Sequence, residues 1–319
     1  MSDSLIDAPA GSGAEQSAVA ASLTPIGAGA AGLASPHVVR RGGEFVHYAV
    51  RNPKLLFGLA LEALFVLGAI IGPIISPHNA TDLFRSYLHP SAQHWLGTNN
   101  IGNDLFAQLV YGLRDSYLVG ALGALCASAI GMALGFIAGY RGGWLDEVLQ
   151  MVTNIMVMIP SLVLLIVIGA YLTTRGVLFE GVFIGLTTWP WVARAVRAQT
   201  FTLRSRDFVD LARLSGKRPA AIVVRDIAPN MASYLFLVVV LLFGSSMLLA
   251  ASYDFLGLGP TNGISLGTMM NQAMLWSALQ LHTWWWFVAP GVVLTGMVVA
   301  LLIANVGLDE VFNPKLRSQ

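Results

Sequence analysis

The chain has 319 residues, of which 55% are hydrophobic and only 11% are charged. Soluble domains carry about 25% charged residues, and the mean hydropathy here is +0.68. The composition therefore excludes a water-soluble globular protein and predicts an integral membrane protein. The formal net charge of +1 indicates no particular partner. We expect the lipid bilayer as its surroundings and no nucleic acid.

The sequence offers no residue set typical of catalysis or metal binding. The one cysteine, Cys126, lies in an apolar stretch and has no partner for a disulfide, so we interpret it as a small core residue. No Cys/His cluster has metal-ligand spacing, and no Ser/His/Asp or Cys/His arrangement stands out. A glycine-rich phosphate loop ending in Lys-Ser or Lys-Thr is also missing. We expect no enzyme activity, no metal and no cofactor bound by this chain.

Composition divides the chain into four parts. Residues 1–39 are predicted to be a disordered tail, because they are rich in Ala, Gly and Ser without apolar periodicity. Residues 40–110 hold the first apolar run and a polar loop. Residues 111–307 form the core of the membrane domain, which contains polar intervals at 205–230 and 252–284. Residues 308–319 are predicted to be a second tail.

Six apolar runs are long enough to cross a bilayer, which needs about 20 residues. Pro160 and Pro190 fall inside two of them, where we expect kinks, since membrane helices tolerate proline. The six expected spans are roughly Leu55–Ile75, Ser116–Tyr140, Val148–Leu172, Val177–Ala195, Leu235–Ala251 and Trp285–Val306.

The distribution of Lys and Arg predicts the orientation of these spans. With the N-terminus inside, the outer segments hold only Arg85, Arg114 and Arg175, which leaves fifteen of the 18 basic residues for the cytoplasmic side. Cytoplasmic loops carry an excess of basic residues. We therefore expect a multi-pass protein with both termini and the interval 205–230 in the cytoplasm.

The interval Ser205–Asn230 has the pattern of two short helices separated by a break. Ser205 can cap the first helix, Gly216 suits a left-handed residue that ends it, and Pro219 suits the first turn of the next. Three apolar residues follow the spacing i, i+3, i+4 and form one narrow face: Phe208, Leu211 and Ala212. A helix with such a face outside the membrane is typical of a docking element.

Several motifs along the chain resemble those of one protein family. The family is that of the membrane subunits of binding-protein-dependent ABC importers, in the dipeptide/oligopeptide/nickel group, and within it the C-type subunit. The family pattern Leu-Gly-Thr-Asp, two residues, Gly-Arg-Asp is kept here except that Asn99 and Asn103 replace the acid and the arginine. The matching blocks are Leu96–Thr98 with Gly102 and Asp104, Gly139–Asp146, Ile159–Ser161, Phe255–Gly259 and Asn313–Arg317.

This resemblance implies an all-α fold of the type I importer permease, with about six transmembrane helices and a cytoplasmic coupling loop at 205–230. The family's Glu-Ala-Ala, three residues, Gly pattern becomes Asp-Leu-Ala before Gly216, which alters how the helix seats. The resemblance implies that the loop docks in an ATPase cleft, as a helix in a groove. The residues expected to carry this coupling are Phe208, Asp210, Leu211, Ala212, Arg213, Gly216 and Lys217.

The resemblance also implies the partners. These are a second, homologous permease subunit, two cytoplasmic ATPase subunits or domains that bind ATP and Mg²⁺, and an extracytoplasmic substrate-binding protein. The location implied is the cell membrane of a prokaryote. The outer interval 252–284, where an interfacial helix is expected within Ile264–Leu281, would help form the surface beneath the binding protein.

The sequence gives fewer signals for the translocation path than for the coupling loop. Glu62 lies in the middle of the first span, where an acid costs roughly 2.5–3.5 kcal/mol on insertion scales. It either contacts the pore or partner subunit, or is protonated or hydrogen-bonded to a neighbouring helix, and both interpretations stay open. The candidate path residues are Glu62, Thr153, Asn154, Met158 and Ser161.

Peptides are the cargo that the resemblance implies first, while oligosaccharides and nickel or other metal chelates are carried by the same framework. A secondary transporter is a second class of function, but it predicts inverted repeats with interrupted spans in two halves, and no repeat is evident. A membrane-embedded enzyme is a third class. It needs several ionisable residues converging within the spans, which Glu62 alone does not supply.

Overall fold

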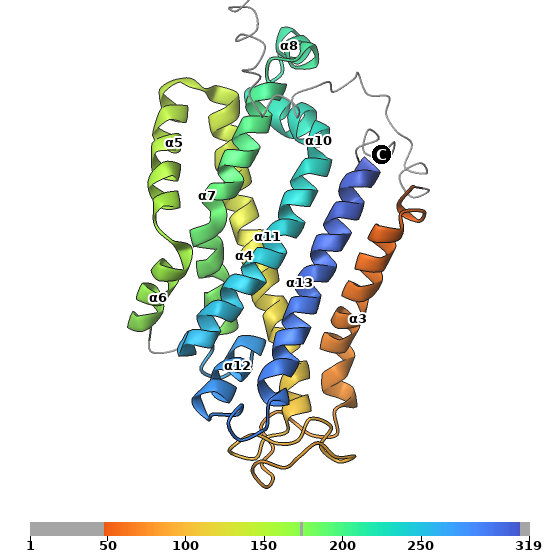
Figure 1. The fold of residues 1–319 in the computed structure, drawn as a ribbon. Helices are drawn as coiled ribbons and strands as arrows, with labels where there is room; N and C mark the ends of the chain where they lie inside the picture. Colours follow the sequence, from red (N-terminus) through yellow and green to blue (C-terminus); the bar gives the residue numbers. More distant parts are fainter. Residues whose placement is uncertain (1–47, 173–174, 313–319) are drawn as a thin grey trace, which may run out of the picture. The chain divides into compact units, whose positions relative to one another are not determined.

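Within the residues that the structure describes, all regular elements are helices. The computed structural model describes residues 48–172 and 175–312, so the tail predicted at 1–39 and the Asn313–Arg317 motif lie outside them. The long helices are α3 (Pro53–Ile75), α4 (Leu105–Arg141), α7 (Val177–Leu203), α11 (Ala232–Tyr253) and α13 (Trp285–Phe312) (Figure 1). This confirms the all-α fold.

Helix α4 is the central element of the described bundle, and it packs along α7 and also against α11 and α3. Its small residues allow this close approach. A Cβ added at Gly135 would lie 2.8 Å from the carbonyl oxygen of Ala193 on α7, and one at Gly131 would lie 2.8 Å from that of Trp189. Helix α3 packs mainly on α13, beside α4 (Figure 1).

Four of the described helices are long and apolar enough to cross a membrane: α3, α4, α11 with the turn that extends it, and α13. A fifth is obtained if α5 (Gly143–Met158) and α6 (Ser161–Tyr171) are one bent span. Helix α7, which corresponds to the expected span Val177–Ala195, has 27 residues but is less apolar, since it carries Glu180, Arg194 and Arg197. A count of six is therefore not confirmed by length and composition.

The expected span Val148–Leu172 is not one helix. It breaks at Ile159 and Pro160, where α5 and α6 meet at a bend of 77°. Proline lacks an N–H for the helix and drives the preceding residue into extended backbone, and Ile159 has φ −87° and ψ 118°. Pro190, by contrast, lies buried within α7, which continues past it.

Two expected boundaries differ from the structure. Helix α4 begins at Leu105, eleven residues before the expected Ser116, because Asp104 caps it by accepting the Ala107 N–H at 2.8 Å. Helix α13 continues to Phe312, so residues 308–312 belong to it rather than to a tail. Leu308 and Val311 are buried there against Leu55 of α3.

The residues that follow α11, up to Leu275, are partly buried in the bundle. A π-helical turn, η3 (Asp254–Leu258), extends α11, and α12 (Leu266–Leu275) follows. Ser265 and Thr268 form a capping box at the start of α12. Met269 and Ala273 on α12 are buried with Trp286 at the start of α13, so one side of α12 is part of the core.

Candidate functional site

The interval 205–230 folds as two short helices with a sharp turn between them, as predicted. Helix α8 (Asp207–Leu214) is followed by α9 (Pro219–Ile222), the π-helical turn η2 (Val223–Ile227) and α10 (Ala228–Asn230). The predicted cap is wrong: Arg206 occupies the N-cap position, and the Ser205 hydroxyl donates instead to the carbonyl oxygen of Thr202.

Gly216 ends α8 in the left-handed conformation, with φ +72°. Its N–H donates to the Arg213 carbonyl at 2.9 Å, and the Lys217 N–H donates to the Ala212 carbonyl at 3.2 Å. This pair of bonds is the Schellman motif, which satisfies carbonyls that a helix end would leave without partners. Gly216 therefore sets the direction in which the chain leaves α8.

One face of α8 is packed into the chain itself. Val209 is 0% exposed and Ala212 is 5% exposed, and both belong to a core cluster with Ile222 and Ile227. The expected docking face of Phe208, Leu211 and Ala212 therefore needs correction. Ala212 anchors α8 to the bundle and is not available to a partner.

The opposite face of α8 presents apolar side chains that this chain does not cover. A step of three residues turns a side chain by about 60° around the axis. Phe208, Leu211 and Leu214 thus move progressively away from the inner face, and their exposed fractions rise from 36% to 66% to 87%. We call these three residues the outer face of α8.

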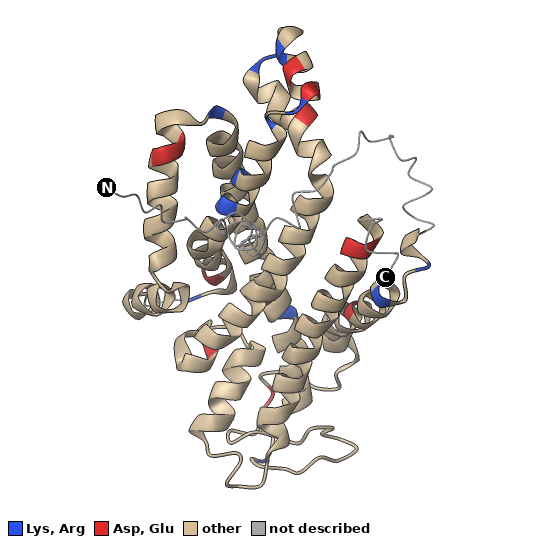
Figure 2. Cartoon of the chain, turned by 45° about the horizontal axis from the view of Figure 1, so that its top comes forward, with Lys and Arg blue, Asp and Glu red and all other residues tan. Residues whose placement is uncertain are grey.

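Charged side chains flank this outer face. The Arg213 guanidinium donates to the Asp210 carboxylate at 2.8 Å, and the Lys217 ammonium bridges both oxygens of Asp226 at 2.8 and 3.1 Å. The adjacent Tyr140 side chain, followed by Asp210, raises the pKa of the Arg213 guanidinium above its usual range. Figure 2 shows basic and acidic residues gathered in and around α8.

Arginines connect this region to the turn between α4 and α5. The Arg213 guanidinium lies 5.6 Å from the centre of the Tyr140 ring. Arg204 donates to the carbonyl oxygens of Gly139 and Tyr140, each at 3.3 Å. Arg197 binds both oxygens of Asp146, at 2.5 and 2.6 Å. Such bidentate pairs fix orientation, so α8, α7 and the α4–α5 turn are held together.

In the polar loop before α4, the amides that replace the family's acid and arginine contact each other. Asn99 Oδ1 accepts the Asn103 N–H at 2.9 Å, and the Asn99 side-chain amide donates to Asn103 Oδ1 at 3.2 Å. Gly102 has φ +95°, and a Cβ there would lie 2.0 Å from the Phe84 carbonyl oxygen. Asn99 and Asn103, the two residues that depart from the family pattern, are thus hydrogen-bonded to each other.

A cavity of about 550 Å³ lies among α5, α6, α7, α11 and α13. Its wall is mostly apolar, with the hydroxyl groups of Ser161, Thr187, Thr188 and Ser245 as polar exceptions. Of the described residues that line it, none is charged. The size falls within the range of about 300–1,000 Å³ that is usual for small-molecule sites.

The structure brings only Ser161 of the five expected path residues to this cavity. Glu62 instead accepts a hydrogen bond from the Tyr117 hydroxyl at 2.8 Å, and Asn154 accepts one from Arg194 at 2.7 Å. Thr153 is buried and bonds its own helix at Leu149. Met158 is 80% exposed, because it ends α5 just before the bend.

These features together define the class of protein: a helical membrane protein with a mostly apolar cavity between its helices and an anchored helix exposed at one end. Residues 131–318 match the family described as binding-protein-dependent transport system inner membrane component. The chain belongs to this family. The match confirms the resemblance to membrane subunits of ABC importers and makes the chain one component of a larger transport system.

Three relatives named as permease proteins are similar to most of the chain. The oligopeptide transport system permease proteins OppC of Mycobacterium tuberculosis (strain ATCC 25618 / H37Rv) and Mycobacterium bovis (strain ATCC BAA-935 / AF2122/97) are each 32% identical over 273 residues, covering 84% of this chain and 93% of the relative. A Brucella suis protein, named "Putative peptide permease protein BRA0407/BS1330_II0404", is 31% identical over 269 residues, covering 83% and 88%.

The sequence analysis missed Leu214 of the outer face and the cavity residues that come from α11 and α13. Leu214 continues the outer face by one more step of three, a signal that was available in the sequence. The cavity is also lined by Gly244 and Ser245 of α11 and by Leu301 of α13. No local sequence signal indicates these residues, because the cavity forms by packing between segments far apart in the chain.

Proposed function

We propose that this chain is a pore-forming membrane subunit of an ATP-driven importer, and that α8 couples it to a cytoplasmic ATPase. The observation that carries the proposal is the division of α8 into two faces. Val209 and Ala212 fix the helix to the chain's own core, while Phe208, Leu211 and Leu214 remain exposed. A helix held rigidly on one side and uncovered on the other can transmit force from a docked partner.

The partner that we propose for α8 is an ATPase subunit that closes around ATP and Mg²⁺. Two such subunits would each hold one coupling helix in a groove, one helix from this chain and one from a homologous permease. Closure would move α8 as a rigid body, and Arg204 and Arg213 would pass that movement to the α4–α5 turn. The bundle would then rock between inward- and outward-open states.

The orientation proposed for the chain follows from its charges. In the topology expected from the sequence, fifteen of the 18 basic residues belong to the same side as the interval 205–230, which supports a cytoplasmic position for α8 and both termini. The loop before α4 and the segment containing α12 would then face outward. There we propose contact with an extracytoplasmic binding protein that delivers the cargo.

Peptides are the cargo that we propose, and the printed names of the OppC relatives support this choice. The cavity described above would form this subunit's share of the path. Its uncharged wall with a few hydroxyl groups suits brief contacts with peptide backbone rather than tight binding, since a path that held its cargo firmly would release it slowly.

A substitution that fills this cavity is expected to block uptake. Gly244 lines the cavity, and a Cβ there would meet only Leu301 and Val298 side chains, at 3.7 and 3.8 Å. Gly244→Leu should therefore lower peptide uptake by about tenfold or more while basal ATP hydrolysis by the assembled complex is retained. Radiolabelled peptide uptake into proteoliposomes and phosphate release measure the two quantities.

Gly291→Leu is the matched control for this variant. Gly291 also lies in a long helix, outside the cavity, and a Cβ there would meet only the Met270 methyl group, at 3.8 Å. It should transport normally. Equal losses in both variants, or none in Gly244→Leu, would contradict the assignment of the cavity to the path.

The cargo class is tested by reconstituting the complex with its binding protein and measuring stimulated ATPase activity. Peptides, oligosaccharides and nickel chelates are supplied separately. We expect stimulation by peptides. Stimulation by one of the other classes alone would overturn the peptide proposal, and transport by this chain alone on an ion gradient would overturn the importer proposal as a whole.

A further inference from the structure

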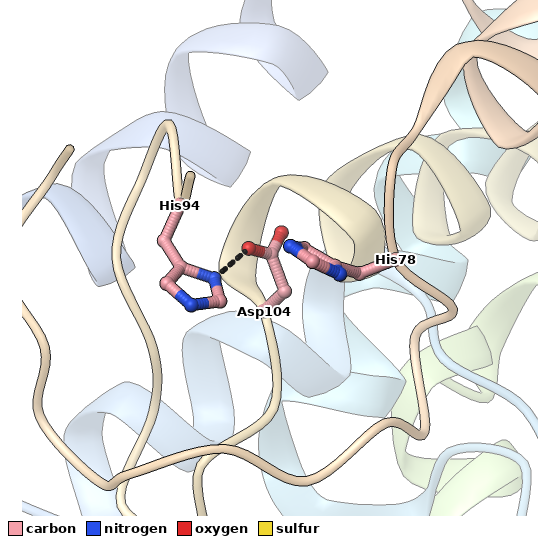
Figure 3. Close-up of side chains that lie close together, drawn as sticks. All are labelled: His78, His94 and Asp104. Atoms are coloured by element: carbon pink, nitrogen blue, oxygen red, sulfur yellow. Dashed lines mark hydrogen bonds and ion pairs between the residues drawn. The ribbon is translucent and has the colours of Figure 1, made fainter. Parts of the chain in front are cut away.

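Two histidines and an aspartate meet at the base of the loop that connects α3 to α4. His78 follows the end of α3, His94 lies within the loop, and Asp104 caps α4. One ligand atom from each of the three lies within 4.8 Å of the others. Figure 3 shows both imidazole rings beside the Asp104 carboxylate. Nothing in the sequence pattern indicated this cluster, because separations of 16 and 10 residues match no familiar ligand spacing.

The three side chains are held in place by contacts outside the cluster. The Asp104 carboxylate uses Oδ1 to accept the Ala107 N–H at 2.8 Å, which leaves Oδ2 facing His94 Nδ1 at 2.8 Å. His78 Nε2 lies 3.1 Å from the Gln93 carbonyl oxygen. The Phe84 ring packs edge-on against both imidazoles, at 4.5 and 4.7 Å between ring centres.

Two of the three side chains are shielded from water. His94 is 6% exposed and Asp104 is 2% exposed. Within residues 48–172 and 175–312, the one ion-pair partner recorded for Asp104 is His94, whose charge depends on protonation. Buried charges are normally paired or bound to metal, and a divalent cation would neutralise this carboxylate.

We propose that His78, His94 and Asp104 bind a divalent transition-metal ion, with Zn²⁺ as the best fit. Two imidazole nitrogens and one carboxylate oxygen are a common set of three zinc ligands, with water in the fourth position. Half-buried His78 leaves an approach from solvent. Ligand atoms around tetrahedral zinc are about 3.3 Å apart. The widest separation in the cluster, at most 4.8 Å, would shorten by about 1.5 Å or less, and the 2.8 Å between His94 Nδ1 and Asp104 Oδ2 would lengthen by about 0.5 Å.

Such an ion would join the end of α3, the loop and the start of α4 at one point. Hydrogen bonds already connect the loop to itself through Asn99 and Asn103 and to the start of α4 through the Leu105 N–H, which donates to the Gly97 carbonyl at 3.0 Å. A metal ion would add a connection through side chains that also includes the end of α3. The proposal is independent of the importer function, because it concerns the architecture of the loop and not the path or the ATPase.

The test is calorimetric titration of Zn²⁺ into the full-length chain in detergent, purified with a tag free of histidine and stripped with a chelator. The native chain should bind about one equivalent, and His78→Ala should weaken binding by about tenfold or more. Asp104→Asn should weaken it similarly while preserving the helix cap, since its amide oxygen can still accept the Ala107 N–H. Mg²⁺ should not compete, because it prefers oxygen ligands.

His89→Ala is the matched control, since His89 lies in the same loop but packs against Trp285 at 5.6 Å between ring centres. It should bind Zn²⁺ as the native chain does. X-ray absorption of the loaded chain should show only nitrogen and oxygen neighbours at about 2.0–2.2 Å. Absence of saturable binding by the native chain, or equal affinities of the native chain and His78→Ala, would overturn the proposal.

Discussion

Replacing Gly216 by valine should uncouple uptake from ATP hydrolysis. The left-handed conformation with φ +72° costs about 1–2 kcal/mol for a residue with a Cβ, and a β-branched side chain is poorly suited to it. Strain of this size changes a conformational equilibrium by about 5- to 30-fold. We therefore expect Gly216→Val to lower coupled peptide uptake by about that factor in proteoliposomes that contain the complete complex.

A second variant at the same position tests whether backbone strain is the cause. Gly216→Asn should largely restore uptake, because asparagine tolerates the left-handed region. Unchanged coupled uptake by Gly216→Val would contradict the role given to this turn.

Placing a charge on the outer face of α8 should detach the ATPase. Leu211 is 66% exposed, so its replacement by aspartate removes no buried contact within the chain. If Leu211 fills a pocket in the partner, its loss should cost about 2 kcal/mol or more, as at other interface hot spots. That corresponds to about 30-fold weaker association, measured by copurification of the ATPase and by titration in detergent.

Placing an aspartate on the inner face of α8 should lower the stability of the chain instead of its association with the ATPase. Val209→Asp would bury an unpaired carboxylate in the core cluster that includes Ala212 and Ile222, which is strongly unfavourable. We expect a large drop in the melting temperature of the purified chain for Val209→Asp and almost none for Leu211→Asp. If Leu211→Asp retained full association with the ATPase, docking through the outer face would be wrong.

The helix, turn and second helix of residues 205–230 could be predicted from the sequence because their signals are local. Gly216 and Pro219 mark the end of one helix and the start of the next through backbone preferences that hold in any context. Which side of α8 faces inward is not a local property. It depends on Ile222 and Ile227, which fold back onto Val209, and the assignment of Ala212 to the docking face failed for that reason.

The path could not be predicted in the same way. Thr153 and Asn154 are polar residues in an apolar run, which is typical of pore-facing positions, yet the structure uses both for contacts within the bundle. The break at Pro160 turns α6 away from α5, so residues on one expected helix do not share one face. The cavity arises where α7, α11 and α13 meet, and no single segment indicates it.

The cluster of His78, His94 and Asp104 could not be predicted from residue spacing either. His78, His94 and Asp104 come together in a loop that turns at Gly97 and Gly102, where φ is +73° and +95°. Residue spacing identifies metal sites when the ligands share one helix or hairpin. A site assembled from a helix end, a loop and a helix cap has no such spacing.

Cross-linking from single cysteines on α8 tests the central claim most directly. The chain has one cysteine, so Cys126→Ala provides a background in which Leu211→Cys or Leu214→Cys carries a photoreactive maleimide within the assembled complex. We predict covalent adducts with the ATPase subunit from both positions, and none from a label at Thr202, an exposed site on α7 before the coupling loop. Adducts from Thr202 alone, or from none of the three positions, would contradict a coupling role for α8.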